Sequence, residues 1–217
     1  GMTHRSPSGL RILHATRLLG FSGAGEIADR AGAAEDETQE FLREAEGKGW
    51  TNEMAFADLR GWSLTDDGRV ENERQLARER GTADPERVIE SVHRSFLPLN
   101  ARLLRACTDW QLAPVTGDRF APNDHSDPVR DERILTELAA LSAALTPLVD
   151  RLTAVLARFG GYDTRFETAL RLARSGQHDW VDKTSIDSCH RVWFQLHEDL
   201  VATLGIDRST EGAIDPY

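Results

Sequence analysis

The stretch IDSCHRVWFQLHEDLVATLG near the C-terminus places two histidines and two large aromatic residues at helical spacing. His190, Trp193 and His197 lie three and four residues apart, so they share one face of a helix. Phe194 adjoins this face, and Asp187 lies one turn before His190. Aromatic rings with N–H groups supply apolar surface and hydrogen-bond donors together, which is the composition of a small-molecule pocket.

Polar and aromatic residues further upstream have the types needed to complete such a pocket. They lie in an expected helix and in the loop PNDHSD. The candidate effector pocket consists of Asn100, Asp109, Trp110, Asn123, Asp124, His125, Asp187, His190, Trp193 and His197. The competing interpretation is that these histidines are structural and form hydrogen bonds with loop carboxylates or carbonyls.

The histidine spacing argues against a metal site on this helix. His190 and His197 are two turns apart, roughly 10 Å along the axis, so a single ion cannot bind both. An ion would need His190 with Asp187 and one loop residue, His125 or Asp124. The chain has neither an HExxH nor a CxxC motif. We therefore predict no bound metal and no cofactor.

No catalytic constellation is found in the sequence, and we predict that the protein is not an enzyme. Cys189 and His190 are adjacent, so their side chains diverge on a helix and cannot form a dyad. Ser188 lacks the strand–turn–helix setting that a GxSxG nucleophile needs. The stretch GFSGAGE follows no expected strand, which favours a turn between helices over a phosphate-binding loop.

The composition is that of an acidic chain with an ordinary share of apolar residues. Its 217 residues carry a formal net charge of -10, so the overall field does not attract nucleic-acid phosphates, although local basic patches can. Two cysteines do not make a disulfide framework and fit a reducing compartment. We find no apolar run of membrane-spanning length and expect a soluble, cytoplasmic protein without a membrane partner.

Hydrophobic periodicity and turn residues predict a winged helix in the first eighty residues. Three helices are expected, followed by two short strands joined by a loop and by a fourth helix. These elements are Leu10–Phe21, Gly25–Ala31, Ala34–Gly47, Trp50–Met54, Gly61–Leu64 and Asp66–Arg80. Gly32 supplies the tight turn between the second and third helices, because glycine adopts positive φ at little cost.

The remainder is expected to be all-helical, so the fold class is mainly α with a small β wing. Its expected helices are 86–110, 127–159, 162–175 and 185–204. We place a winged-helix domain at residues 9–80, a helical domain at 84–205 and a flexible tail at 206–217. An apolar stripe on the first of these helices could form a dimer contact or the protein's own core. It consists of Val88, Val92, Phe96, Leu99 and Leu103.

Three stretches resemble the MarR-like winged-helix family of bacterial transcriptional regulators. GEIADRAG matches the second helix and its turn, FLREAEGKGW the step into the wing, and WSLTDDGR the exit from the wing. The resemblance covers about a third of the chain and implies that the third helix reads double-stranded DNA. It places the base-reading residues on the outer face of the third helix, at Glu35, Asp36, Glu37, Gln39, Glu40 and Arg43. We predict that Arg30, Thr38, Gln39, Arg43, Lys48 and Arg60 contact DNA, and that a basic rim is formed by Arg11, Arg17, Arg30, Lys48, Arg60 and Arg69.

The charge of the third helix leaves two functions open. Its outer face carries Glu35, Asp36, Glu37 and Glu40. These acids would repel phosphates, because like charges at about 4 Å cost about 1 kcal/mol even in water. The first function is transcriptional regulation by a DNA-binding homodimer whose helical domain senses an effector. The second is a winged helix without DNA binding that acts as a protein-interaction module and regulates a partner enzyme.

Two stretches in the second half add a further resemblance. Pro122–Asp127 and Ile186–Gly205 are similar to a helical region of actinobacterial proteins. Some of those proteins are regulators or are associated with phosphoenolpyruvate-utilising dikinases. The resemblance implies a sensory or regulatory module and not a catalytic one.

Overall fold

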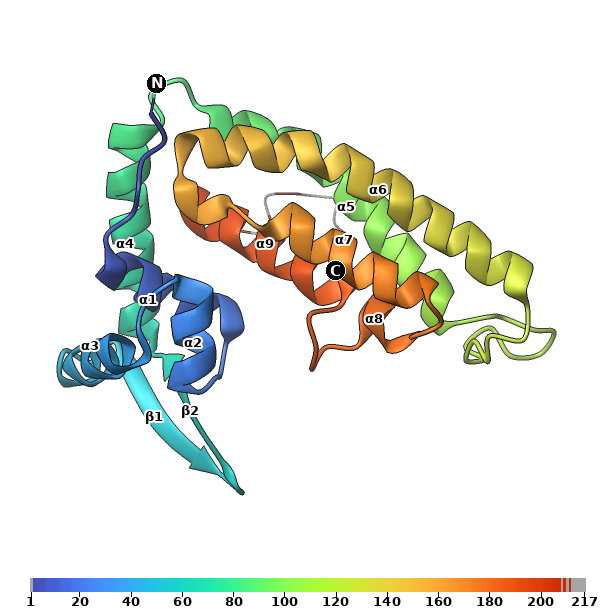
Figure 1. The fold of residues 1–217 in the computed structure, drawn as a ribbon, viewed down its shortest axis with the longest axis horizontal. Coiled ribbons are helices and arrows are strands. Elements are labelled where there is room, and N and C mark those ends of the chain that lie inside the picture. The colour runs from blue at the N-terminus through green and yellow to red at the C-terminus, as the bar shows by residue number, and fades with distance from the viewer. Residues whose placement is uncertain (1, 208, 210, 212–217) are drawn as a thin grey trace. The chain divides into compact units, whose positions relative to one another are not determined.

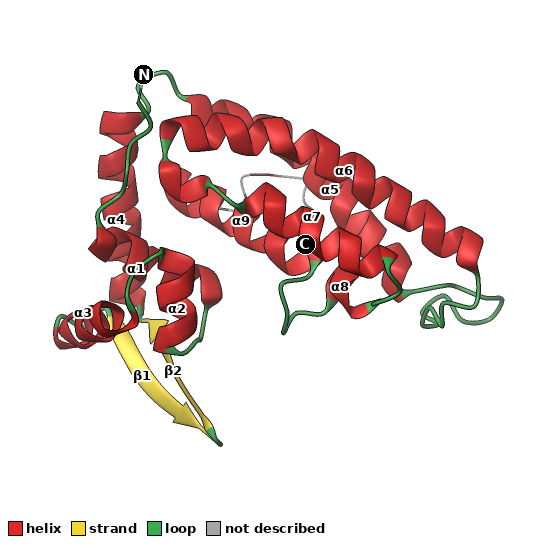
Figure 2. Cartoon of the chain, viewed as in Figure 1, coloured by secondary structure: helices red, strands yellow, loops and turns green. Residues whose placement is uncertain are grey.

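The computed structural model describes residues 2–207, 209 and 211 and is mainly helical (Figures 1 and 2). Its elements are α1 (Ser8–Leu19), α2 (Ala24–Ala31), α3 (Glu35–Gly47), β1 (Thr51–Phe56), β2 (Leu59–Leu64), α4 (Asp66–Ala83), α5 (Val88–Gln111), α6 (Pro128–Val155), a 3-10 turn (Ala157–Phe159), α7 (Tyr162–Arg174), α8 (Asp179–Asp182) and α9 (Cys189–Leu204).

The chain divides into two compact units. The winged-helix unit contains the residues up to Arg87, together with Ala154–Arg158 and Glu198–Ile206. The helical unit contains Val88–Thr153, Phe159–His197 and the described residues from Asp207 onward. The last turns of α9 therefore pack with the winged helix, whereas its first turns pack with the helical unit.

The winged-helix unit has three helices followed by a two-stranded antiparallel sheet, which confirms the expected winged helix-turn-helix fold. The strands pair in the register Thr51↔Leu64 to Phe56↔Leu59. The buried residues at the centre of the unit are Ile12, Ile27, Leu42 and Trp62. Each comes from a different element, so burial of one apolar face per element fixes α3 against its neighbours. Gly32, in the left-handed conformation, ends α2 as predicted.

The motif WSLTDDGR has a packing explanation. Thr65 is the N-cap of α4, where its Oγ1 accepts a hydrogen bond from the Gly68 N–H at 2.9 Å. Gly68 lies against the backbone before β1, and a Cβ at this position would be 1.9 Å from the Trp50 carbonyl oxygen. Only glycine fits, so the motif closes the hairpin onto the start of α4.

The helical unit is built from α5, α6, α7, α8 and the first turns of α9. Its centre is aromatic: the rings of Phe96 and Trp193 stack with centroids 5.1 Å apart, and Phe166 lies 5.6 Å from Trp193. The three residues are fully buried and come from α5, α9 and α7. Val92 and Leu103 of the α5 apolar stripe are also buried within the chain, so the stripe serves the protein's own core.

Several bounds differ from the sequence-based expectation. The hairpin is longer, with strands of six residues each. The last helix begins at Cys189 and not near 185, because Ser188 accepts a hydrogen bond from the Arg191 N–H at 3.2 Å. The long helix ends at Val155 and not near 159. Residues 154–158 and 198–206, expected in the helical domain or its tail, belong to the winged-helix unit.

The tail expected at 206–217 lies largely outside the described residues. Glu211 is described, and it is buried. Its carboxylate contacts His93 and His197 at 2.6–3.0 Å. The expectation of a loose tail is therefore wrong at this residue, because an acid buried between two imidazoles is held in place.

Helix α6 is long and apolar enough to cross a membrane, by length and composition alone. The sequence interpretation missed this, because it searched for an uncharged run and not for a helix with an apolar interior. Leu138, Leu141, Leu145 and Leu152 lie on one side of α6 and are fully buried in the chain. Of the apolar window in α6, 39% is buried within the chain, so the protein's own core covers part of this helix.

Candidate functional site

The outer face of α3 is exposed and mainly acidic. Helix α3 begins without a side-chain cap at Ala34, and the acids of its first turn lie where the helix dipole favours negative charge. The exposed acidic residues of α3 are Glu35, Asp36, Glu37, Glu40, Glu44 and Glu46. Gln39 and Arg43 are the hydrogen-bond donors on the same exposed face, one turn apart.

Two arginines flank one glutamate at the junction between α3 and the hairpin. The Arg43 guanidinium lies 3.8 Å from the Glu53 carboxylate and 5.6 Å above the Trp62 ring centroid. Arg60, from β2, lies 4.0 Å from the same carboxylate. Both arginine side chains are more than 60% exposed, at 63% and 74%. Ion pairs this exposed are weak, so a phosphate can compete for either guanidinium.

The other residues expected to contact DNA have different surroundings. Thr38 is fully buried and donates to the Ala34 carbonyl at 2.9 Å; it faces the core, so we remove it from the DNA-contacting set. Lys48 is exposed, with its ammonium 4.8 Å above the Trp50 ring. Arg30 is half-buried on α2, and Gln39 is exposed.

The expected basic rim is smaller than the sequence indicated. Arg11 donates to the backbone carbonyls of Ala31 and Ser6, so it holds α1 against the chain. Arg17 is buried and pairs with Glu73 and Glu198. Arg69 is exposed but lies 3.6 Å from Glu198. Helical spacing alone could not separate arginines that point into the fold from those that point to solvent.

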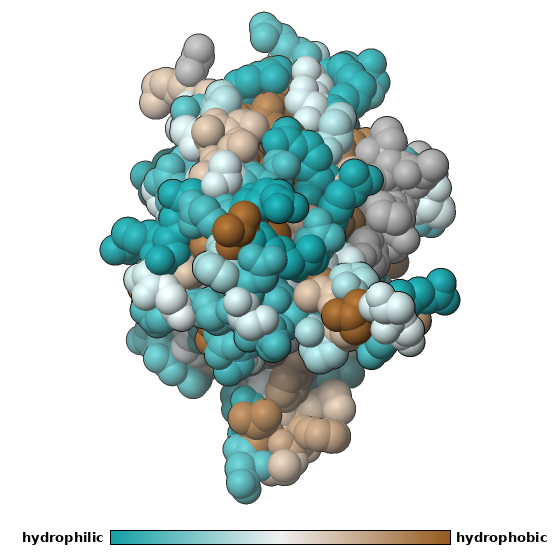
Figure 3. All heavy atoms as spheres, turned by 90° about the vertical axis from the view of Figure 1, so that its right-hand side faces the viewer, coloured by the Kyte–Doolittle hydropathy of each residue, from teal (hydrophilic) through white to brown (hydrophobic). Residues whose placement is uncertain are grey.

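The tip of the hairpin is apolar. Met54, Phe56 and Leu59 are 51%, 71% and 65% exposed, and Figure 3 shows hydrophobic residues gathered at this end of the molecule, the lowest part of the view. The turn between the strands consists of Ala57 and Asp58, and the exposed Arg60 directly follows Leu59. An exposed apolar group at the end of a hairpin is a surface suited to protein contacts.

A pocket of about 250 Å³ lies between α5 and α9 within the helical unit. From α5 it is lined by Asn100, Leu103, Leu104, Cys107, Thr108 and Gln111. From α9 it is lined by His190, Trp193, Phe194 and His197. Both sets repeat every three or four residues, so each helix presents one continuous face to the pocket. The pocket is smaller than the roughly 300–1,000 Å³ typical of drug-sized ligands, and it suits a single ring or a short chain.

One buried polar group in this pocket is only half satisfied. The Asn100 side chain is 2% exposed, and its Oδ1 accepts a hydrogen bond from the Trp193 indole N–H at 3.0 Å. Since Trp193 can only donate, this bond fixes which end of the amide carries the N–H groups. The Asn100 Nδ2 has no hydrogen-bond partner in the described part of the chain. A buried donor left in this state costs about 1–3 kcal/mol.

Burial favours the uncharged forms of two titratable groups of the pocket, His190 and Cys107. Burial lowers the pKa of His190, and the opposing attraction of Asp182 is weaker. Burial raises the pKa of the Cys107 thiol, which therefore stays protonated at neutral pH. Outside the pocket lining, burial likewise raises the pKa of Cys189 to about 12. None of the ten residues that line the pocket is an aspartate, glutamate, lysine or arginine.

Four of the ten residues expected in an effector pocket line this cavity: Asn100, His190, Trp193 and His197. The other six lie elsewhere. Asp187 forms an ion pair with Arg165 at 2.7 Å, and Asp109 and Asp124 are exposed. Phe194, which the sequence placed on the same helix face, also lines the cavity. The α5 residues Leu103, Leu104, Cys107, Thr108 and Gln111 were not predicted as pocket residues. Leu103 belongs to the predicted apolar stripe, but residue spacing cannot distinguish the wall of a cavity from a filled core.

Trp110, Asn123 and His125 form a separate cluster. The His125 Nδ1 lies 2.7 Å from the Asp131 carboxylate, and its ring lies 4.6 Å from Trp110 and 4.0 Å from His178, measured between centroids. Asn123 donates to the Trp110 carbonyl at 2.9 Å and so holds the loop onto α5. His125, Asp131 and His178 have ligand atoms close enough for a metal ion.

A second group whose ligand atoms are close enough for a metal ion consists of His93, His197 and Glu211, which are all buried. Two imidazoles and a carboxylate are a donor set that zinc accepts. Hydrogen bonds of 2.6–3.0 Å between the imidazoles and the carboxylate also satisfy the group without an ion. Neither group contains His190, so the ligand set considered from the sequence, His190 with Asp187 and a loop residue, is not assembled.

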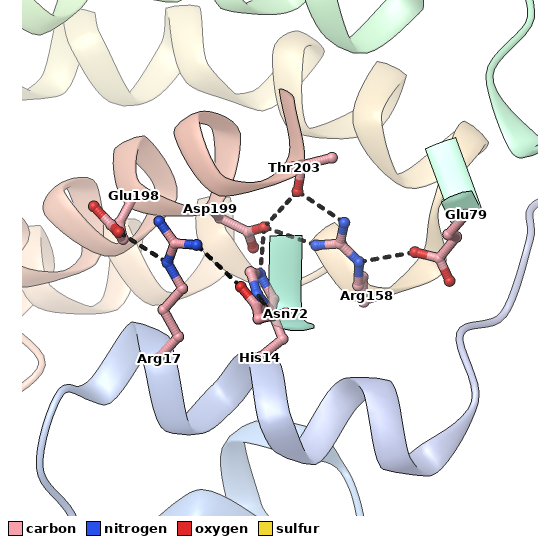
Figure 4. A network of polar contacts seen from close by, with 8 residues as sticks. All are labelled: His14, Arg17, Asn72, Glu79, Arg158, Glu198, Asp199 and Thr203. Atoms are coloured by element: carbon pink, nitrogen blue, oxygen red, sulfur yellow. Dashed lines mark hydrogen bonds and ion pairs between the residues drawn. The ribbon is translucent and has the colours of Figure 1, made fainter. Parts of the chain in front are cut away.

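The winged-helix unit contains a buried polar network that the sequence did not reveal (Figure 4). The His14 Nε2 lies 2.8 Å from the Asp199 Oδ1, and the His14 Nδ1 lies 3.2 Å from the Asn72 amide nitrogen. Arg158 donates to Asp199 at 2.7 Å. Arg17 donates to the Asn72 Oδ1 at 3.1 Å. This network connects α1, α4, the segment 154–158 and the last turns of α9.

The protonation of His14 follows from these partners. Arg17 occupies the Asn72 Oδ1, so Asn72 presents its N–H groups to the His14 Nδ1, which must accept. His14 is then neutral and donates from Nε2 to Asp199. Burial lowers the pKa of His14, Asp199 opposes this, and Arg158 and Arg17 add to it. The second nitrogen of this His–Asp pair meets an amide and not a nucleophile, so the pair is arranged to hold helices together.

Comparison of the chain with protein-family models, with curated proteins and with solved structures finds no match.

Proposed function

We propose that the protein is a MarR-like winged-helix transcriptional regulator that binds double-stranded DNA through α3 and the hairpin. The observation that carries the proposal is the pair of exposed guanidiniums, Arg43 and Arg60, at the junction of these two elements. In such a fold α3 enters the major groove and the hairpin lies along the backbone. Arg43 and Gln39 then face base edges, while Arg60 and Lys48 face phosphates.

The acidic residues of α3 set limits on this binding. A glutamate can accept a hydrogen bond from the N4 amino group of cytosine, but six acids next to phosphates oppose the complex. Binding must then be weak on random sequences and depend on a few well-placed contacts. We further propose that a homodimer presents two copies of α3 to a palindrome, and that the helical unit serves sensing or dimerisation. A cytoplasmic location goes with this function.

The test is binding of the full-length protein to a DNA duplex from upstream of its own gene, measured by fluorescence anisotropy across a salt series. We expect a specific complex with a slope of about -2 to -4 in log affinity against log salt, which corresponds to few phosphate contacts. Arg43→Ala is expected to weaken binding by about 1–3 kcal/mol. Arg60→Ala is expected to reduce the salt slope by about 1. Arg171→Ala, exposed on α7, is the matched control.

A second candidate function is a protein-interaction module without DNA binding. The apolar hairpin tip, Met54, Phe56 and Leu59, favours it because these three side chains are exposed, and the acidic face of α3 is poorly suited to phosphates. The partner would be basic and amphipathic. Absence of any DNA complex at about 20 mM salt would contradict the first proposal and direct attention to this one. Phe56→Ser would then abolish binding of the partner while leaving the fold intact, because the side chain is exposed.

A further inference from the structure

The pocket between α5 and α9 has a polar group that nothing in the described chain satisfies. The Asn100 amide is held in one orientation, because its Oδ1 accepts from Trp193. Trp193 is itself packed against Phe96 and Phe166. The amide therefore cannot rotate to find another partner, and its N–H groups stay without one. Rigid, desolvated donors of this kind are the groups that fix a ligand in a mostly apolar pocket.

The rest of the lining selects for an uncharged, apolar molecule. Leu103, Leu104 and Phe194 supply aliphatic and aromatic surface, and the lining contains no aspartate, glutamate, lysine or arginine. Glu211, which hydrogen-bonds His197, does not belong to the lining. A water molecule is stable in a buried site when it has about two to four polar partners, and most of this surface offers none.

We propose that the helical unit binds a small, uncharged, mainly apolar molecule whose carbonyl or ether oxygen accepts a hydrogen bond from the Asn100 Nδ2. The volume of about 250 Å³ admits a molecule of one ring or a short chain. The site lies wholly within the helical unit, so the proposal goes beyond DNA binding and does not depend on it. The absence of ligand binding would therefore leave the DNA-binding proposal intact, and the absence of DNA binding would leave the ligand proposal intact.

The test uses two probes of the same shape, acetophenone and α-methylstyrene, in which a carbonyl oxygen is replaced by a methylene group. Both are titrated into the ¹⁵N-labelled full-length protein, and the indole N–H of Trp193 and the side-chain amide of Asn100 are followed by NMR. We expect saturable binding of acetophenone, with a dissociation constant on the order of millimolar for so small a molecule. Acetophenone should shift the Asn100 amide protons, whereas α-methylstyrene should shift only the Trp193 signal.

Substitution of the donor provides the decisive comparison. Asn100→Leu keeps a side chain of similar size but removes the N–H groups. The ratio of the two affinities, acetophenone over α-methylstyrene, should fall by about tenfold or more, because only the ketone loses a hydrogen bond. The two probes differ in hydrophobicity, but this difference affects the ratio equally in the wild-type protein and in Asn100→Leu, so it cancels in the comparison. An unchanged ratio would overturn the proposal, as would the absence of saturable acetophenone binding to the wild-type protein.

A pair of tryptophan substitutions locates the site. Leu104 lines the pocket, and the adjacent Arg105 is exposed and does not. Leu104→Trp should fill the cavity and weaken binding of both probes by about tenfold or more, whereas Arg105→Trp should leave it unchanged. Binding to Leu104→Trp at wild-type affinity would place the probes elsewhere and refute the assignment. If Leu104→Trp does not fold, the Asn100→Leu ratio decides alone.

Discussion

Two buried asparagines, one in each unit, differ by a single hydrogen bond. Asn72 accepts from Arg17 at 3.1 Å and donates to His14 at 3.2 Å. Asn100 accepts from Trp193 at 3.0 Å, but its amide nitrogen has no partner in the described chain. Both side chains are almost inaccessible, at 1% and 2% exposure. Burial alone therefore does not distinguish a residue that holds the fold from one that is available to a ligand.

The difference lies in how completely each side-chain amide is hydrogen-bonded. The network around Asn72 alternates donors and acceptors, so that His14, Asp199 and Arg158 each meet a complementary group. Such a network is rigid, and the removal of one member leaves others buried and unpaired. Asn100 instead borders a cavity, where the partner of its amide can come from outside the chain. The Asn72 amide is satisfied at both ends, which favours a structural role, although the Arg17 Nη2 in the same network also has no partner in the described chain. The open donor of the Asn100 amide favours binding.

The largest expected effect is at Asp199, which is 1% exposed and contacts His14, Arg158 and Thr203. Asp199→Ala should lower the free energy of unfolding by about 3–5 kcal/mol, because it leaves the Arg158 guanidinium buried with less compensation. Urea denaturation followed by circular dichroism measures this. Asp150→Ala, exposed on α6, should stay within about 0.5 kcal/mol of the wild-type protein. A similar loss in both variants would show that the network contributes nothing specific.

The paired substitutions Asn72→Leu and Asn100→Leu test the comparison itself. Asn72→Leu removes a charge-assisted bond from Arg17 and leaves His14 without its donor, so it should cost about 2–3 kcal/mol. Asn100→Leu leaves the Trp193 N–H unpaired but also removes an unpaired amide, so it should cost only about 0–1 kcal/mol. Denaturant midpoints of the two variants measure the difference. Equal losses would mean that the Asn100 amide is satisfied in solution, and the contrast between the two residues would disappear.

The local features of the winged helix could be predicted from the sequence. Gly32 ends α2 and Thr65 begins α4 through interactions within a few residues, so their positions follow from residue type. The α9 half of the pocket was also accessible, because His190, Trp193 and His197 share a face by spacing alone. These features depend on interactions between residues that are close in the sequence, so residue type and spacing are enough to predict them.

The features that depend on tertiary packing could not be predicted. The sequence grouped Asn100 with the loop that contains His125, but this loop packs outside the pocket. No local signal indicates which segment of the chain faces α9. His14 and Asp199 are 185 residues apart, and neither stands out in its own helix. Thr38 was expected to contact DNA, but it faces inward on α3. In each case the partner comes from a distant part of the chain.

The smallest expected effect is a pH dependence of stability, which distinguishes a neutral His14 from a protonated His14 in the contact with Asp199. If His14 is neutral and accepts from Asn72, its pKa in the folded protein lies below its ordinary value of 6.5. The unfolded state then binds more protons, so stability from this residue is complete above pH 6.5 and is lost as the pH falls through the folded pKa. The difference in unfolding free energy between the wild-type protein and His14→Gln should therefore shrink from pH 7.5 to pH 5. A difference that grows toward low pH would instead indicate a protonated imidazole paired with Asp199. The Asn72 amide would then have to turn away from His14, and its contrast with Asn100 would be lost.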